Sequence, residues 1–135
     1  MIRVVLDTNV LVSAIISDGK SRELLKKGIA RQYQIVTSDL ILKELVSVLR
    51  RPKFKTSEDE VRKTVIALIR TADVVSVKTK IKAVEVDPKD DMIIETAIDG
   101  DAEIIVSGDS HLIALKIFEE IKIVTVEEML TLLSH

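Results

Sequence analysis

The chain contains no cysteine, no tryptophan and only three aromatic residues, Tyr33, Phe54 and Phe118. The absence of cysteine excludes a disulfide scaffold, a cysteine nucleophile and a zinc site built from thiolates. Because His111 and His135 are its only histidines, a histidine-rich metal centre is excluded as well. The scarcity of aromatic rings argues against base stacking, so any contact with nucleic acid is expected to run mostly through phosphates.

Long apolar segments and a leader sequence are also lacking. No apolar run reaches the roughly 18 residues of a transmembrane span, and residues 1–7 have no signal-peptide features. We therefore expect a soluble, cytoplasmic protein without membrane contact. Its 135 residues, of which 47% are hydrophobic and 31% charged, suffice for a single domain spanning residues 1–135 around one core.

The formal net charge of −2 conceals two segments of opposite charge. Residues 19–55 contain ten basic and three acidic side chains, whereas residues 85–109 contain nine acidic side chains and one basic one. This asymmetry predicts a basic surface near an acidic pocket, although two solvated helix faces would produce the same pattern.

Short, continuously apolar segments alternate with segments of helical periodicity. Strands are expected at residues 2–6, 33–37, 74–77, 103–106 and 121–124. Helices are expected from residue 8, over residues 21–30, 38–50, 57–72 and 90–98, and from residue 126 to the end. This alternation is typical of a parallel sheet covered on both faces. The sequence therefore predicts an α/β class: a three-layer α/β/α fold with a parallel sheet of roughly five strands.

Two carboxylates follow predicted strands directly. Asp7 ends the first strand and Asp109 comes shortly after the fourth, in Val-Ser-Gly-Asp. Both are expected at the carboxyl edge of the sheet, where open α/β sheets bind their ligands. Each also has a purely structural interpretation, Asp7 as a helix N-cap and Asp109 as a turn residue.

Two further carboxylates lie on predicted helices. With about 100° of rotation per residue, Asp90 falls in the middle of the apolar stripe of its helix, while Asp91 and Glu95 fall toward its rim. Glu44 borders the apolar stripe of the helix over residues 38–50, where an ordinary boundary glutamate is an equal alternative. An inward-facing carboxylate must be neutralised, hydrogen-bonded or bound to a metal ion.

Convergence of Asp7, Glu44, Asp90 and Asp109 at one edge would create strong mutual repulsion, which raises pKa values or recruits a cation. Oxygen ligands without cysteine or histidine select hard ions, so Mg²⁺ or Mn²⁺ is expected. Phosphodiester hydrolysis is the chemistry that such a centre supports.

Five stretches resemble the motifs of the PIN-domain family. In chain order they are Val4–Ser13, Leu40–Leu45, Arg50–Phe54, Asp87–Ala97 and Val106–Asp109. The third of these resembles a stretch common in a subfamily of toxin components. The resemblance extends from Ile2 to about Val126. It agrees with the helical-wheel argument in selecting Asp90 rather than Asp91.

The resemblance implies a Mg²⁺- or Mn²⁺-dependent endoribonuclease, the VapC-type toxin of a type II toxin–antitoxin system. It implies catalytic and metal-binding roles for Asp7, Glu44, Asp90 and Asp109. It also implies a supporting group that orients the acids or a water, namely Thr8, Asn9 and Ser107, with Asp91 as an accessory ligand. The expected partners are an RNA substrate, a cognate antitoxin protein, and a second copy of the chain in a homodimer or higher homo-oligomer.

The chain departs from many relatives at His111, where they carry another acid. This departure puts a fifth acidic ligand in doubt, and we expect His111 to begin a helix or contact phosphate rather than act as a general base. For steering RNA through its phosphates, the best basic cluster is Arg50, Arg51, Lys53 and Lys55, which could equally be a solubilising helix end.

Two other classes of protein remain open at this point. One is a non-catalytic RNA- or protein-binding module on the same fold. The other is a phosphoacceptor receiver domain, which also binds Mg²⁺ at the carboxyl edge of an α/β sheet. A receiver domain has paired acids after its first strand, whereas Asp7 is followed by Thr8 and Asn9.

Overall fold

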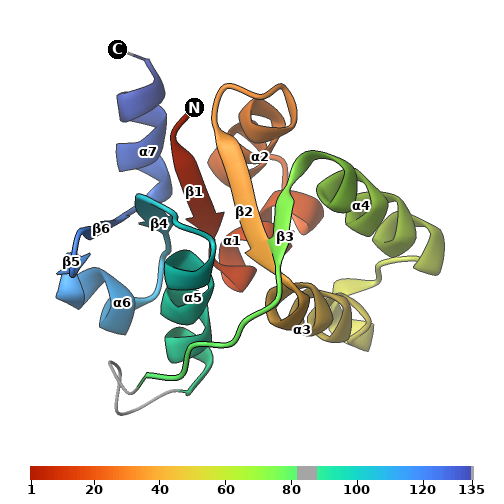
Figure 1. Ribbon diagram of the computed structural model, residues 1–135. Coiled ribbons are helices and arrows are strands. Elements are labelled where there is room, and N and C mark those ends of the chain that lie inside the picture. Colours follow the sequence, from red (N-terminus) through yellow and green to blue (C-terminus); the bar gives the residue numbers. More distant parts are fainter. Residues whose placement is uncertain (82–87, 135) are drawn as a thin grey trace.

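A computed structural model describes residues 1–81 and 88–134. Six strands form one sheet in the order β3-β2-β1-β4-β6-β5 (Figure 1). They are β1 (Arg3–Leu6), β2 (Gln34–Ser38), β3 (Asp73–Val75), β4 (Ile104–Val106), β5 (Ile117–Phe118) and β6 (Ile121–Val124). The five predicted strands are confirmed and pair in parallel. The sixth, β5, pairs antiparallel with β6 at the edge of the sheet, and its two residues were too few to predict.

The helices surround this sheet on both faces. They are α1 (Thr8–Ile16), α2 (Lys20–Ile29), α3 (Asp39–Leu49), α4 (Glu58–Thr71), α5 (Pro88–Asp99), α6 (Ser110–Leu115) and α7 (Val126–Leu133), with a 3-10 turn, η1 (Pro52–Phe54). The sequence did not predict η1, and it indicated α6 only through His111 as a helix-start residue, because neither element is long enough to establish a helical period. Within the described ranges, no helix has both the length and the apolar character needed to cross a membrane.

The strand order decides which helices lie on which face. From β1 the chain moves to β2 and then β3 in one direction, whereas from β3 it returns past β1 to β4 and then β6. Right-handed crossovers therefore place α1 to α4 on one face and α5 and α6 on the other. Accordingly, α5 packs on β1, β2 and β4, while α1 and α2 pack against each other behind the sheet (Figure 1).

The same strand order excludes the receiver-domain alternative. In the flavodoxin-like order of receiver domains, the first strand lies between the second and the third. Here β1 lies between β2 and β4. The chain is therefore not a phosphoacceptor receiver domain.

The core consists of apolar strands buried on both faces. Val4, Val5 and Leu6 of β1 are at most 1% exposed, and Ile105 and Val106 of β4 are fully buried. Residues on both sides of these strands are buried because helices cover both faces, as the continuous apolar runs predicted. The two central strands are thus rigid supports for the residues that follow them.

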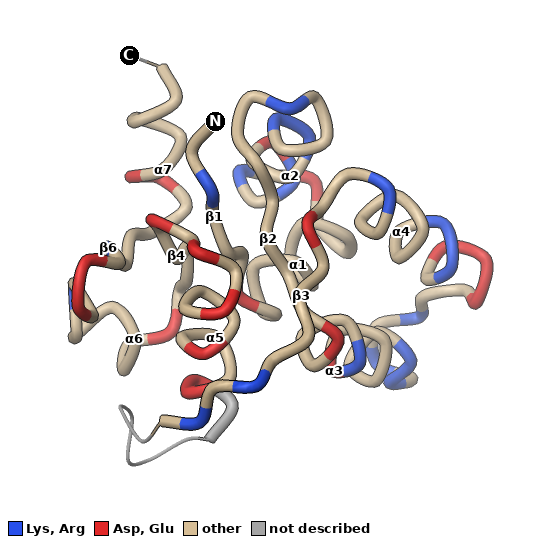
Figure 2. The backbone as a smooth tube through the Cα atoms, viewed as in Figure 1, with Lys and Arg blue, Asp and Glu red and all other residues tan. Residues whose placement is uncertain are grey.

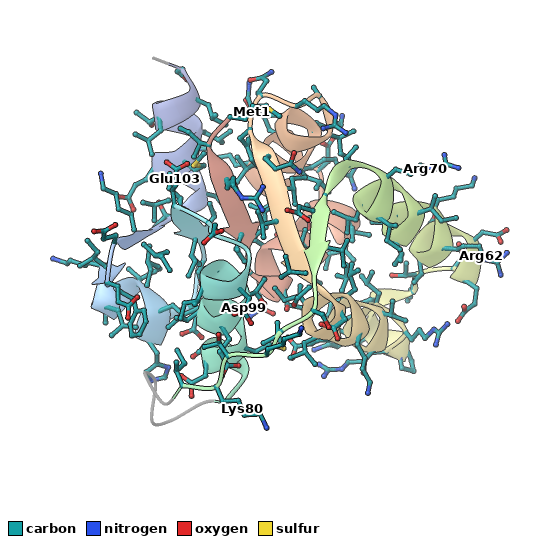
Figure 3. The ribbon with its side chains drawn as sticks, viewed as in Figure 1. Met1, Arg62, Arg70, Lys80, Asp99 and Glu103 are labelled. Carbon is teal, nitrogen blue, oxygen red and sulfur yellow. The ribbon has the colours of Figure 1, made fainter. Side chains whose placement is uncertain are left out.

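Residues 78–81, which follow β3, are held against α5 by two carboxylates. Asp99 accepts hydrogen bonds from the backbone N–H groups of Lys78 and Thr79, at 2.7 and 2.9 Å. Glu95 accepts one from the N–H of Ile81 at 2.8 Å. Figure 3 labels Asp99 on α5 and Lys80 on this segment. The segment therefore covers a side of α5 that the helical wheel assigned to the rim.

Basic and acidic side chains are concentrated in two different parts of the fold (Figure 2). Thirteen of the twenty lysines and arginines lie between residues 20 and 70, on α2, α3, α4 and the turns that connect them, whereas α5 and the turns around β4 are mainly acidic. The two segments of opposite charge in the sequence are thus segregated in space, and the functional site described below lies where they meet.

Candidate metal centre

The site lies at the carboxyl ends of the two central strands. After β1 and β4 the chain leaves in opposite directions, which opens a crevice between the two connections; ligands of open α/β sheets bind in such crevices. Asp7 follows β1, and its backbone N–H donates to Val106 O at 3.0 Å, so β1 and β4 stay paired up to this point. Asp109 follows β4 on the neighbouring connection.

Asp7 is buried, with 5% of its surface exposed. It is the N-cap of α1: its Oδ1 accepts from the backbone N–H of Asn9 at 3.0 Å. Its Oδ2 accepts from the hydroxyl of Ser107 at 2.6 Å. Burial raises the pKa of Asp7 above its ordinary value, and the nearby charges of Asp109 and Glu44 raise the pKa further, although the two hydrogen bonds oppose the shift.

Ser107 joins the two strand ends. Its hydroxyl donates to Asp7 and accepts from the backbone N–H of Asp109 at 2.9 Å, and the side chain is fully buried. Of the three predicted supporting residues, Ser107 contacts an acid through its side chain and Asn9 through its backbone. The buried hydroxyl of Thr8 has no hydrogen-bond partner among the described residues.

Asp109 is the N-cap of the short helix α6. Its Oδ1 accepts from the backbone N–H groups of His111 and Leu112, at 2.8 and 3.2 Å. The expectation that His111 begins a helix is confirmed, since it is the second residue of α6. The structural interpretation from the sequence, a turn residue, is thus replaced by a helix cap, and Asp109 also lines the cavity described below.

The helical-wheel argument is correct for Asp90 and wrong for Asp91. Asp90 is 6% exposed, as predicted, but Asp91 is also buried, at 9%. The wheel placed Asp91 at the rim of the apolar stripe together with Glu95. One turn further along that side, Glu95 accepts the N–H of Ile81, so contacts with other parts of the chain, and not the apolar stripe alone, decide how exposed this side of α5 is.

Glu44 reaches the site from α3. The inward side of α3 is formed by the fully buried Ile41, Leu45 and Leu49, and Glu44 is half-buried beside them. The start of α3 is tied to α5 by a buried hydrogen bond of 2.9 Å between the hydroxyls of Ser38 and Thr96. This bond connects the two helices that carry Glu44 and Asp90.

All four predicted acids line one cavity of about 300 Å³. We call it the carboxylate cavity, and its charged walls are Asp7, Glu44, Asp90, Asp109, Arg51 and Lys53. The predicted basic cluster is therefore divided. Arg51 and Lys53 line the cavity, whereas Arg50 forms an ion pair with Glu58 at 3.1 Å and Lys55 does not belong to the cavity wall.

The donor set fits a divalent cation. Ligand atoms of Asp90, Asp109 and His111 all lie within 4.8 Å of one another, and no other such group occurs among the described residues. Asp7 and Glu44 bring further carboxylate oxygens to the same cavity. Sequence reasoning did not include His111 in this group; its spacing of two residues from Asp109, where relatives carry an acid, was the available signal.

Comparison with known proteins identifies the family. A family model described as "PIN domain" matches residues 3–111. The fold and the acidic cavity thus define a class, and the chain belongs to the PIN-domain family. Among curated proteins, none matches the chain.

Two crystal structures illustrate the fold. PAE2754 from Pyrobaculum aerophilum is 14% identical, with a TM-score of 0.67 over 98% of this chain and 90% of that one. VapBC2 from Rickettsia felis, bound to a DNA fragment from its promoter, is 16% identical, with a TM-score of 0.64 over 92% of this chain and 98% of that one.

Proposed function

We propose that this chain is a metal-dependent endoribonuclease that hydrolyses phosphodiester bonds in RNA. The observation that carries the proposal is the convergence of four carboxylates, from β1, α3, α5 and the end of β4, on one small cavity. Such a concentration of acids at the switch point of an α/β sheet is suited to divalent ions and, through them, to phosphate chemistry. Membership of the PIN-domain family supports the same conclusion.

In this proposal Asp90 and Asp109 hold Mg²⁺ or Mn²⁺, with Asp7 and Glu44 as further ligands or as acceptors that position a water. When bound, a divalent ion lowers the pKa of water and stabilises charge on the phosphoryl group. Ser107 keeps Asp7 in place through the 2.6 Å hydrogen bond and holds the Asp109 backbone through the 2.9 Å one. Thr8, Asn9 and Asp91 remain predicted supporting residues.

Arg51 and Lys53 add two cationic side chains to the wall of the cavity that the acids line. Because RNA approaches as a polyanion, positive charges beside the acidic centre reduce the repulsion that the carboxylates exert on a phosphate. We infer that these two residues contact phosphates that flank the scissile bond. Arg50 and Lys55, outside the cavity wall, would add long-range attraction only.

We further propose that the protein is the toxin component of a type II toxin–antitoxin system. The similarity in fold to VapBC2 from Rickettsia felis supports this role and an antitoxin protein as partner. The Arg50–Phe54 stretch supports it independently of the fold. Self-association into a homodimer or higher oligomer, and a cytoplasmic location, stay predictions from the sequence.

A cleavage assay tests the enzymatic proposal. A panel of single-stranded and structured RNAs is incubated with the protein and Mn²⁺, Mg²⁺ or EDTA. We expect cleavage with the ions, none with EDTA, and a loss of at least about 100-fold in Asp90→Asn, because that change removes a charged ligand of the centre.

The matched control is Asp101→Asn. Asp101 is exposed and adopts a left-handed conformation (φ 50°) that asparagine tolerates well, so the same chemical change there is harmless. It should cleave RNA like the wild type. Undiminished cleavage by Asp90→Asn, or in EDTA, would show that the activity does not depend on this cavity.

A further inference from the structure

His111 stands beside two carboxylates of the carboxylate cavity. One of its ring nitrogens, one Asp90 oxygen and one Asp109 oxygen all lie within 4.8 Å of one another. Ligands of one octahedral ion with bonds of about 2.1 Å lie about 3.0 to 4.2 Å apart. The three groups therefore already stand close to the spacing that a shared ion requires.

Among the described residues, no hydrogen bond holds the ring of His111 in another position. Its side chain is 52% exposed, and its Nδ1 lies 3.6 Å from Asp109 Oδ1, beyond hydrogen-bond distance. The contribution of His111 to α6 is its backbone N–H, which donates to Asp109 whatever side chain is attached. The ring can therefore turn toward an ion without disturbing the helix.

Chemistry distinguishes this group from a purely acidic centre. Mg²⁺ strongly prefers oxygen ligands and keeps several waters, whereas first-row transition ions also accept imidazole nitrogen. An imidazole in place of a carboxylate also removes one negative charge, and that charge is the main attraction for Mg²⁺. Both the imidazole nitrogen and the smaller negative charge therefore favour a first-row transition ion over Mg²⁺ at Asp90, Asp109 and His111.

We propose that His111 is a metal ligand that, together with Asp90 and Asp109, makes the centre prefer a first-row transition ion, represented by Mn²⁺, over Mg²⁺. This inference rests on the proposed metal-dependent function and deepens it, because it selects between the two ions that the acids alone leave open. It assigns the side chain a direct contact with the ion rather than with phosphate.

Electron spin-echo spectroscopy of bound Mn²⁺ tests the contact directly. A coordinated imidazole nitrogen produces a nitrogen modulation that carboxylates and water cannot produce. The sequence holds only two histidines, so His135→Ala is a matched control for His111→Ala. We expect the modulation in the wild type and in His135→Ala, and its loss in His111→Ala and His111→Asp.

Calorimetric titration with Mn²⁺ and Mg²⁺ tests the preference. In His111→Ala we expect Mn²⁺ affinity to fall about tenfold and Mg²⁺ affinity to change less than about threefold. His111→Asp should strengthen Mg²⁺ binding, so the ratio of Mn²⁺ to Mg²⁺ affinity should be lowest in this variant. If His111→Ala lowered the affinities for Mn²⁺ and Mg²⁺ by the same factor, the proposed preference would be overturned.

The possible failures are distinguishable. If Mn²⁺ binds the wild type without nitrogen modulation, or if the modulation survives in His111→Ala, the role of His111 is refuted while the metal-dependent nuclease stands. If Mn²⁺ does not bind the wild type and Asp90→Asn changes nothing, both proposals are refuted. Because the ring is half-exposed, these variants are expected to fold, and unchanged circular dichroism would verify it.

Discussion

Two acidic hollows lie at opposite ends of the same sheet. The carboxylate cavity, about 300 Å³, is at the carboxyl ends of β1 and β4. A larger hollow of about 520 Å³ lies near the amino ends of β4 and β6, and we call it the exposed acidic hollow. Figure 3 labels Glu103, one of its members. Its four acids are Asp101, Glu103, Glu119 and Glu120.

Each hollow is lined by four acidic side chains, and the two hollows differ in how deeply those side chains are buried. The four acids of the exposed acidic hollow are all exposed and lie on turns before strands, where water solvates them. In the carboxylate cavity, Asp7 and Asp90 are only 5% and 6% exposed. A buried carboxylate is costly unless protons, hydrogen bonds or a cation compensate it. Burial, rather than the number of acids or the size of the hollow, therefore marks the candidate site.

The largest expected difference between the two hollows is that between Asp7→Asn in the carboxylate cavity and Asp101→Asn in the exposed acidic hollow. Asp7→Asn should reduce RNA cleavage at least about 100-fold, yet raise the free energy of unfolding of the metal-free protein, on the order of 1 kcal/mol, because it removes a buried and repelled charge. Asp101→Asn should change neither. Cleavage assays and denaturant unfolding in EDTA measure the two effects; a destabilised Asp7→Asn would contradict the burial argument.

The stability effect of Asp7 should depend on pH. The pKa of Asp7 is raised above its ordinary value of 3.8 in the folded chain, chiefly by burial. Between the unfolded and folded pKa values the folded state binds more protons, so stability falls as pH rises through this interval and stays lower above it. The advantage of Asp7→Asn in EDTA should therefore grow as pH rises from the ordinary pKa of an aspartate, about 4, through the raised pKa of the folded chain. An advantage that is independent of pH would exclude this cause.

A smaller effect is expected from Ser107→Ala, which leaves all four acids in place. Losing the hydrogen bond to Asp7 and the acceptor for the Asp109 N–H should weaken metal affinity or cleavage about tenfold, the usual scale for a residue that orients ligands. The matched control is Ser110→Ala, at an exposed position of α6. Equal metal affinity and cleavage in both variants would mean that Ser107 does not position the acids.

The smallest expected effect, on RNA affinity, comes from the basic side chains that line one hollow and not the other. Arg51 and Lys53 line the carboxylate cavity, while no lysine or arginine lines the exposed acidic hollow in the described part of the chain. Arg51→Ala should weaken RNA binding a few-fold and lower the slope of log affinity against log salt by about 0.7. Arg62→Ala, on the exposed side of α4 (Figure 3), should change the affinity less. Fluorescence anisotropy over a salt series measures both.

Much of the fold and of the site could be predicted from the sequence because the signals are local. Continuous apolar runs predicted buried parallel strands, and Ser38 and Thr125 marked the helix starts that they cap. Asp7 and Asp109 were placed at one edge because each directly follows a strand. Asp90 was placed inward because helical rotation relates it to its own apolar neighbours.

What could not be predicted depends on residues distant in sequence. The burial of Asp91 depends on how α5 packs in the folded chain, and no period within α5 contains that information. Arg50 and Arg51 are adjacent in sequence, yet Arg51 lines the carboxylate cavity while Arg50 pairs with Glu58. His111 approaches Asp90 only because β4 lies beside β1 and α5 packs over both strands.

The sequence by itself therefore determined the five parallel strands, the longer helices and the four candidate acids, because periodicity and strand ends act within a few residues. Only the tertiary structure decided which charges share a cavity, how deeply Asp91 is buried, and which nitrogen joins the acids. These outcomes depend on packing across the strand order, where a rotation or displacement of a few ångströms separates a ligand from a solvated side chain.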